Sequence, residues 1–172
     1  MIDIVLVTEK ACLQVSPEVK HSAMATEEDE TLMAAFKKEG ITCRRVAWED
    51  SDFDWSSTKI ALIKSTWNYF HHIPEFKSWV KKNSEKCKLV NNKDLVLWNM
   101  NKQYLLDLQE EGISIPETYI LNDKKSFNAG KWSEKLGGKG FVVKPLISGG
   151  SKDTYYVKPS FNQTEIKIEK EL

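Results

Sequence analysis

The chain has 172 residues, 41% hydrophobic and 29% charged, which allows one ordinary domain or two small ones with an apolar core. Its 25 basic and 25 acidic side chains cancel, which excludes a broad electrostatic attraction to nucleic acid or anionic lipid. The three cysteines are widely spaced and form no CxxC motif, so they indicate neither a zinc site nor a disulfide framework. Reduced thiols in a cytoplasmic protein are expected.

The first half alternates predicted strands and helices. Ile4–Val7 is an apolar run too short to span a membrane and is typical of a strand covered on both faces. A helix capped by Thr26 follows and ends at Gly40, and a second helix carries Pro74 in its first turn. Further strands are predicted at residues 42–48, 60–63 and 88–90. This βαβ order predicts a small parallel sheet with helices on both sides.

The second half has a different pattern. A helical run over residues 92–111 ends at Gly112, and a strand is predicted within residues 113–121. Ser126 is expected to cap another helix. Strands then follow at residues 141–144, 154–157 and 164–168. Clustered strands of this kind predict an α+β unit with an antiparallel sheet. The expected fold class is α/β, with a small parallel-sheet, Rossmann-like domain over residues 1–95 and an α+β subdomain over residues 96–172.

The strongest local signal for chemistry is a predicted strand ending at Lys144, followed by a loop of small residues. The loop residues are Ser148, Gly149, Gly150 and Ser151. Small residues let backbone N–H groups approach a phosphate closely, and a lysine ammonium acts as a point charge on phosphate oxygens. Neither GxxxxGK[ST] nor GxGxxG occurs, so this is not a Walker or dinucleotide loop. A hairpin whose glycines serve only the turn explains the pattern equally well.

A second lysine, Lys102, is predicted near the start of a helix. A cation in the first helical turn lies at the unfavourable end of the helix dipole. A bound phosphate is one contact that would offset this cost. A solvated lysine is the simpler alternative.

A polar and aromatic loop follows the third predicted strand. It contains Lys64, Ser65, Thr66, Trp67, Asn68 and Tyr69. Ligands of open parallel sheets bind beyond the carboxyl ends of the strands, so this loop is predicted to contact a substrate. Aromatic packing under a loop is the alternative. The three histidines have no Cys, Asp or Glu at ligand spacing, and no metal site is predicted from them.

Taken in chain order, several segments of the sequence resemble those of the ATP-grasp superfamily, in the branch related to bacterial glutathione synthetase and to the ligase of cycloserine biosynthesis. The matching segments are Lys64–Tyr69, Leu89–Asn92, Leu97–Leu105 and Gly112–Thr118. In that branch the loop usually reads arginine and then STWDY, so Lys64 and Asn68 differ from it. The resemblance implies a pre-ATP-grasp domain over residues 1–95. It also implies that residues 96–172 are the N-terminal subdomain of an ATP-grasp clamp.

The resemblance also implies a chemistry. Lys102 and Lys144 would contact the phosphates of ATP, and the loop Ser148–Ser151 would cover them. Such enzymes transfer the γ-phosphoryl group of ATP to a carboxylate, and an amine then attacks the acyl phosphate to give an amide and ADP. The family's Mg²⁺ ligands are expected beyond residue 172, and Glu165, Glu169 and Glu171 are not assigned to that role. The chain alone is therefore expected not to catalyse ligation, and no catalytic residue is predicted.

Three hypotheses stay open. The chain is the front part of such a ligase, a non-catalytic module that binds a nucleotide or small ligand, or a scaffold completed by a second chain. The departures at Lys64 and Asn68 favour the module, and an apolar patch exposed on the second half would favour the scaffold. The expected partners are ATP and a small carboxylate or amine substrate, with no nucleic acid and no membrane. A homodimer is an open option.

Overall fold

The computed structural model describes residues 1–19, 21–121, 127–158 and 168–170. The chain forms two compact units, here called the N-terminal unit (residues 1–98) and the C-terminal unit (residues 99–172). They divide at the end of helix α3 (Lys93–Asn99), whereas the predicted domain boundary lies inside this helix. No helix among the described residues combines the length and the apolar character needed to cross a membrane.

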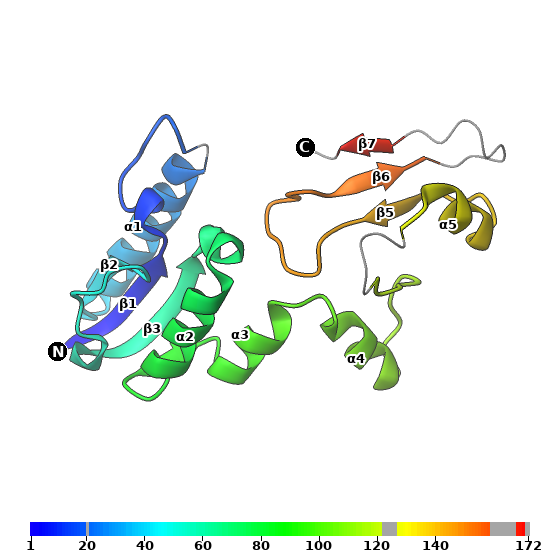
Figure 1. Cartoon of the computed structure of the whole chain (residues 1–172). Coiled ribbons are helices and arrows are strands. Elements are labelled where there is room, and N and C mark those ends of the chain that lie inside the picture. The colour runs from blue at the N-terminus through cyan, green and yellow to red at the C-terminus, as the bar shows by residue number, and fades with distance from the viewer. Residues whose placement is uncertain (20, 122–126, 159–167, 171–172) are drawn as a thin grey trace. The chain divides into compact units, whose positions relative to one another are not determined.

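The N-terminal unit contains the parallel sheet that the sequence predicts (Figure 1). Its strands are β1 (Ile2–Thr8), β2 (Cys43–Ala47), β3 (Thr58–Ser65) and β4 (Lys88–Val90). They are parallel and lie in the order β2-β1-β3-β4. Val5, Leu6 and Val7 are fully buried in the central strand, as expected for a sheet covered on both faces.

Two helices connect these strands. Helix α1 (Ser22–Lys38) joins β1 to β2, and α2 (Ile73–Asn83) joins β3 to β4. Right-handed crossovers that leave a sheet in opposite directions place their helices on opposite faces, so α1 and α2 cover the two faces of the sheet. From β1 the chain crosses to β2 at one edge of the sheet, and from β3 it crosses to β4 at the other edge. The carboxyl ends of β1 and β3 therefore form the topological switch point, where ligands of such sheets bind.

Helix α1 begins at Ser22, one turn before the start predicted at Thr26. The Ser22 hydroxyl donates to the carbonyl oxygen of Ser16 (3.0 Å) and accepts from the Ser16 N–H (2.8 Å). Thr26 lies inside the helix, and its Oγ1 accepts a hydrogen bond from Arg45 at 3.3 Å. The prediction of a Thr26 cap was wrong because contacts with distant residues hold this threonine within the helix. The helix ends at Lys38, before Gly40, as predicted. Gly40 has a positive φ of 71°, the conformation in which glycine commonly terminates a helix.

The core of the N-terminal unit is rich in aromatic rings. Phe76, only 2% exposed, lies on the apolar face predicted for α2. Its ring stacks on Trp79 with centroids 5.6 Å apart and meets Trp48 edge-to-face at 5.2 Å. Trp79 in turn meets Trp55 edge-to-face at 5.0 Å. Such ring pairs each add about 0.5–1.5 kcal/mol beyond area burial, so this cluster holds α2 and the segment Trp55–Ser57 (η2) against the sheet.

The C-terminal unit contains two short helices and an antiparallel sheet, again as predicted (Figure 1). The helices are α4 (Tyr104–Glu110) and α5 (Ala129–Lys135), and the strands are β5 (Phe141–Val143), β6 (Tyr155–Val157) and β7 (Ile168–Lys170). The order is β5-β6-β7 with antiparallel pairing throughout.

Two predictions for this unit were wrong. The helical run over residues 92–111 is broken between α3 and α4, where the Asn101 side chain accepts a hydrogen bond from the Gln103 N–H (3.0 Å) and forms a turn. Lys102 consequently precedes α4 instead of lying in a first helical turn. The described residues 113–121 form no strand, since periodicity alone supplies no pairing partner and Pro116 has no N–H to donate.

Two further predictions are only partly covered by the structure. Ser126 lies outside the described residues, and the cap of α5 is Asn128, whose Oδ1 accepts from the Lys131 N–H at 3.0 Å. The last strand is described over Ile168–Lys170, and residues 164–167 lie outside the described part.

Candidate functional site

Polar residues from three strand ends meet at the switch point of the N-terminal unit. Glu9 follows β1, Trp48 and Glu49 follow β2, and Asn68 comes after β3. Backbone hydrogen bonds join these ends, because the Glu9 N–H donates to the Ser65 carbonyl (2.8 Å) and the Trp48 N–H to Thr8 (2.9 Å). Segments far apart in the sequence thereby form one continuous edge, where a parallel sheet binds its ligand.

Asn68 contacts residues from both of the other strand ends at this edge. Its backbone N–H donates to Glu9 Oε2 (2.5 Å), its Nδ2 donates to Glu49 Oε1 (2.5 Å), and its Oδ1 accepts from Trp48 Nε1 (2.9 Å). The remaining carboxylate oxygens are also bound, Glu9 Oε1 by the Cys12 thiol (3.5 Å) and Glu49 Oε2 by the Lys10 N–H (3.0 Å). Asn68 therefore ties the ends of all three strands together.

The predicted substrate loop is only partly open to solvent. Ser65 and Thr66 are buried, at 1% and 6% exposure, while Trp67 is 37% exposed and meets the His21 ring edge-to-face at 5.7 Å. Trp67 also begins the short 3-10 helix η3 (Trp67–His71). Burial raises the pKa of the Tyr69 phenol, whose ring packs against Phe76. Of the aromatic residues in this loop, Trp67 is the more exposed, and Tyr69 is half-buried against the core residue Phe76.

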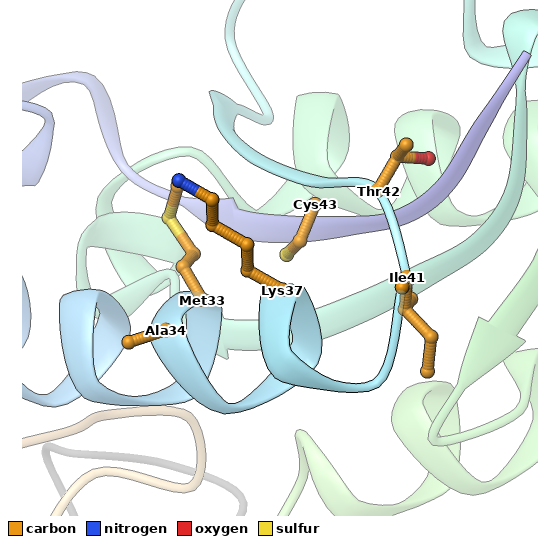
Figure 2. Close-up of a pocket in the computed structure, with 7 residues that line it drawn as sticks. Met33, Ala34, Lys37, Ile41, Thr42 and Cys43 are labelled. Atoms are coloured by element: carbon orange, nitrogen blue, oxygen red, sulfur yellow. The ribbon is translucent and has the colours of Figure 1, made fainter.

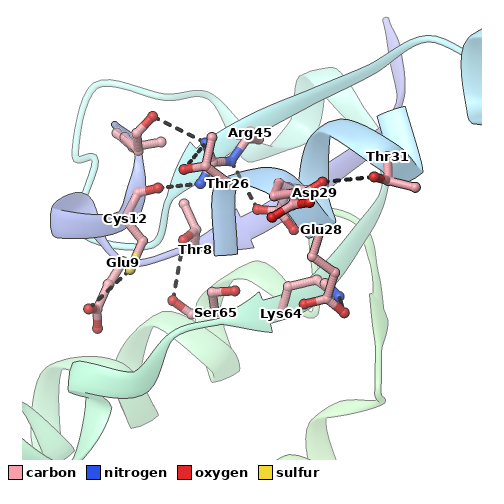
Figure 3. A network of polar contacts seen from close by, with 12 residues as sticks. Thr8, Glu9, Cys12, Thr26, Glu28, Asp29, Thr31, Arg45, Lys64 and Ser65 are labelled. Carbon is pink, nitrogen blue, oxygen red and sulfur yellow. Dashed lines mark hydrogen bonds and ion pairs between the residues drawn. The ribbon is translucent and has the colours of Figure 1, made fainter. Parts of the chain in front are cut away.

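Lys64, expected in the substrate site, has a protein partner in the structure. Its ammonium lies 2.7 Å from Glu28 Oε1 on α1 (Figure 3). The lysine side chain is 19% exposed and the glutamate 56%, so solvent weakens this ion pair. The Lys64 ammonium is thus engaged by a carboxylate of the chain itself.

Sequence reasoning missed three residues of this edge: Glu9, Trp48 and Glu49. The signal was available, because Glu49 directly follows the strand predicted at residues 42–48, Trp48 is the last residue of that strand, and Glu9 lies two positions after the predicted strand Ile4–Val7. Applying the strand-end rule to all three strands, and not to the third alone, would have found them.

Arg45 holds the turn that carries Glu9 against α1 (Figure 3). Its guanidinium lies 2.9 Å from Asp29 Oδ2 and donates to the carbonyl oxygens of Cys12 and Leu13. Burial raises the pKa of the Asp29 carboxyl, an effect that the nearby Arg45 charge only partly opposes. Burial, together with the Glu9 charge, raises the pKa of the Cys12 thiol to about 12, so this cysteine stays protonated and is a poor nucleophile.

The C-terminal unit brings Lys102 to the predicted phosphate loop. Lys102 Nζ lies 2.9 Å from Ser148 Oγ, 3.4 Å from the Ser148 carbonyl oxygen and 3.5 Å from that of Leu146. The Lys102 backbone N–H also donates to Leu146 at 2.9 Å. Burial first, and then the charge of Lys144, lowers the pKa of Lys102. The two lysines are therefore close enough for their charges to interact.

Lys144 directly follows β5 and is exposed. In the loop beyond it, Gly150 and Ser151 both have a φ of 56° and Asp153 has a φ of 54°. Glycine adopts this left-handed conformation readily, whereas for serine it is uncommon. Turn hydrogen bonds from the Lys152 N–H to Gly149 and from the Thr154 N–H to Ser151 (both 3.1 Å) stabilise the loop. The predicted loop is thus an ordered tight turn next to both lysines.

The described residues bear on two further kinds of site, a metal site and a surface pocket. Within the described ranges, no group of three or more His, Cys, Asp or Glu side chains could hold a metal ion. A surface depression of about 490 Å³ lies between α1 and the start of β2, and Figure 2 shows its lining, which includes Met33, Lys37 and Cys43. It lies at the amino end of β2, whereas Asn68 and its partners lie at the carboxyl ends of the strands.

Together, the parallel sheet with its switch point and the lysine-bearing antiparallel unit define an α/β protein with a Rossmann-like first unit. Residues 4–91 match the family of the N-terminal domain of D-cycloserine synthetase DcsG, and the chain belongs to this family. This match also covers β2 and most of β1, which precede Lys64–Tyr69, the first segment that carries the resemblance in the sequence.

Two relatives extend the comparison. The cycloserine biosynthesis protein DcsG of Streptomyces lavendulae is 30% identical over 125 residues, which is 71% of this chain and 42% of that protein. The crystal structure of D-cycloserine synthetase DcsG superposes with a TM-score of 0.72 at 25% identity, over 91% of this chain and 50% of that one. The chain thus spans half or less of the length of these relatives. The predicted fold and the resemblance at the level of the family are confirmed.

Proposed function

We propose that this chain is the front part of an ATP-dependent carboxylate–amine ligase that works through an acyl phosphate. Lys102, Lys144 and the loop Ser148–Ser151 contact the nucleotide phosphates in this proposal. Membership of the DcsG N-terminal domain family supports the ligase class, since the named relatives are a synthetase and a biosynthesis protein.

The observation that carries the proposal is the pair of neighbouring lysines. Lys102 is partly desolvated, and the Lys144 charge lowers its pKa further. No ion pair joins either ammonium to a carboxylate in the part of the chain that the structure describes. Two like charges placed together cost free energy unless an anion binds between them, and phosphate oxygens suit lysine.

In this proposal the carboxylate oxygen of the substrate attacks the γ-phosphorus of ATP and ADP leaves. The amine then attacks the acyl carbon, an amide forms and inorganic phosphate leaves. Lys102 and Lys144 stabilise the negative charge of the phosphoryl group during transfer, and the loop Ser148–Ser151 keeps water away from the acyl phosphate. The loop Lys64–Tyr69 contacts the small carboxylate or amine substrate.

Mg²⁺ is the metal that this chemistry uses to neutralise charge between the phosphates. The described residues do not supply a ligand set for it, so no step is assigned to the ion here. What these residues provide is positive charge and hydrogen-bond donors.

The test is ATP binding to the whole chain, measured by isothermal titration calorimetry. Lys144→Met is expected to weaken binding by roughly 1.5–3 kcal/mol, the range for a hydrogen bond to a charged group. Lys139→Met removes the same charge from another exposed lysine near β5 and should leave the affinity within experimental error. Equal affinity of the Lys144→Met variant and the wild type would remove Lys144 from the site.

A non-catalytic binding module is the second candidate, because Lys64 is paired with Glu28 instead of being held open for a substrate. Both candidates require ATP binding, and they differ in turnover by the protein in its natural length. ADP release with amide formation from amino acids supports the ligase. ATP binding without ADP release supports the module.

A further inference from the structure

The orientation of the Asn68 amide is set by its neighbours. The Trp48 indole N–H can only donate, so the atom 2.9 Å from it is the amide oxygen. An ionised carboxylate can only accept, so the atom 2.5 Å from Glu49 Oε1 is the amide nitrogen. Position 68 therefore needs a side chain that accepts on one side and donates on the other.

Aspartate has nearly the same shape as asparagine but cannot donate when it is ionised. A carboxylate at position 68 would face the Glu49 carboxylate at hydrogen-bond distance, with the Glu9 carboxylate on the adjacent backbone N–H. Like charges at this distance destabilise each other and raise the pKa of one partner. The positive charge of Arg45 is bound to Asp29 and to backbone carbonyls, not to this edge.

We infer that Asn68 is the positioning residue of the loop Lys64–Tyr69, and that its amide, as a donor to Glu49 and an acceptor from Trp48, fixes the loop at the switch point. This inference gives position 68 a role in the substrate loop and so rests on the proposed function. The side chain of Asn68 acts through its neighbours: it holds the backbone directly after the exposed ring of Trp67.

The inference explains the arrangement on both sides of Asn68. The buried residues Ser65 and Thr66 anchor the loop to the end of β3, and the amide anchors it to the ends of β1 and β2. Trp67, which is 37% exposed, lies between these two anchors. Its ring is thereby presented to solvent beside His21 from a backbone held at both ends.

The test uses three variants of the whole chain: Asn68→Asp, Glu49→Gln and the double variant. In the double variant, the amide introduced at position 49 donates to the carboxylate introduced at position 68, and the amide oxygen still accepts from the Lys10 N–H. The hydrogen bond is thus restored with its direction reversed. ¹H–¹⁵N NMR spectra report the Trp48 indole N–H, assigned by its absence in Trp48→Phe, and hydrogen exchange at the backbone N–H of position 68.

For Asn68→Asp at pH 8 we expect a shifted Trp48 indole resonance and hydrogen exchange at position 68 that is faster by about tenfold or more. At about pH 5 the repulsion favours protonation of one carboxylate of the pair, and both signals should approach those of the wild type. The double variant should resemble the wild type at both pH values. The titratable groups in and around this loop include Glu9, Glu49, Cys12, His21, His72, Tyr69 and the Lys64–Glu28 pair, so the wild type is measured at each pH as the reference.

An Asn68→Asp spectrum that matches the wild type at pH 8, or a double variant as perturbed as Asn68→Asp, would overturn the inference. If Asn68→Asp fails to fold, the double variant alone decides, because a merely steric role for Asn68 predicts no rescue by the Glu49→Gln change. None of these spectra needs a nucleotide. An absence of ATP binding by the wild type would therefore refute the proposed function, and equal affinity of Lys144→Met would remove Lys144 from the site, without affecting the result for Asn68.

Discussion

Lys102 Nζ lies 2.9 Å from Ser148 Oγ, so a lysine in the turn before α4 and a hydroxyl in the loop after β5 share a hydrogen bond. The contact joins two segments that the sequence predicts separately. It holds the Lys102 ammonium toward the loop, where two backbone carbonyl oxygens also accept hydrogen bonds from it. A phosphate would compete for the same ammonium group, which gives the site a direct dependence on the charge of Lys102.

The first prediction concerns the pH dependence of ATP binding. Burial and the Lys144 charge lower the pKa of Lys102. Its ammonium therefore loses its proton at a lower pH than an ordinary lysine, whose pKa is about 10.4. ATP affinity is expected to fall as the pH rises through this lowered pKa. Lys144→Met, although weaker at neutral pH, should shift the fall to higher pH because the repulsion is gone. Calorimetric titrations between about pH 7 and 10.5 measure it, and an unchanged profile in Lys144→Met would contradict the coupling.

The second prediction concerns the buried ion pair. The Asp29 side chain is fully buried and that of Arg45 is 10% exposed. Asp29→Ala leaves the guanidinium buried without its counter-charge and is expected to lower the free energy of unfolding by about 3–5 kcal/mol. Urea unfolding measures the change.

Glu28→Ala is the matched control for this variant, because Glu28 precedes Asp29 on the same helix and forms an exposed pair with Lys64. Its expected cost is below about 1 kcal/mol. A similar small cost for both variants would show that Arg45 finds other partners.

The third prediction concerns acid stability. Hydrogen bonds from the Lys59 ammonium, and then from the Thr42 hydroxyl and N–H, hold the pKa of the Asp3 carboxyl well below its usual range. A depressed folded-state pKa contributes stability that is present above the unfolded value, near 3.9, and is lost as the pH falls toward the folded value. The midpoint temperature of thermal unfolding at pH 7 should therefore be higher for the wild type than for Asp3→Ala. The difference should narrow below about pH 3.9, and a constant difference down to pH 2 would contradict the assignment.

The fourth prediction concerns the aromatic core. Phe76 is 2% exposed and contacts the rings of Trp48, Tyr69 and Trp79. Phe76→Ala should cost about 3–5 kcal/mol of unfolding free energy, because a cavity replaces the ring. Met24→Ala, at a side chain 57% exposed, should stay within about 0.5 kcal/mol of the wild type. A cost near that of the control would mean that the neighbouring rings close the cavity.

The periodicity of the sequence was sufficient for most of the elements. Apolar runs predicted β1 and β3, Pro74 and the apolar face that follows it predicted α2, and alternation predicted β6. These patterns are visible because burial on one or two faces of an element fixes which positions are apolar. The broken helix before Lys102 and the missing strand in residues 113–121 were not predictable in this way. A side-chain turn at Asn101 and the lack of a pairing partner decided them.

By itself, the sequence determined the two-unit α/β plan, the family, and the residue types from which an anion site could be built. Those features follow from local patterns. Only the tertiary structure decided that Lys102 contacts Ser148, that Lys64 is paired with Glu28, and that Asn68 joins three strand ends. Each contact links segments distant in sequence, and its formation depends on where the folded sheet places the strand ends, which no local pattern encodes.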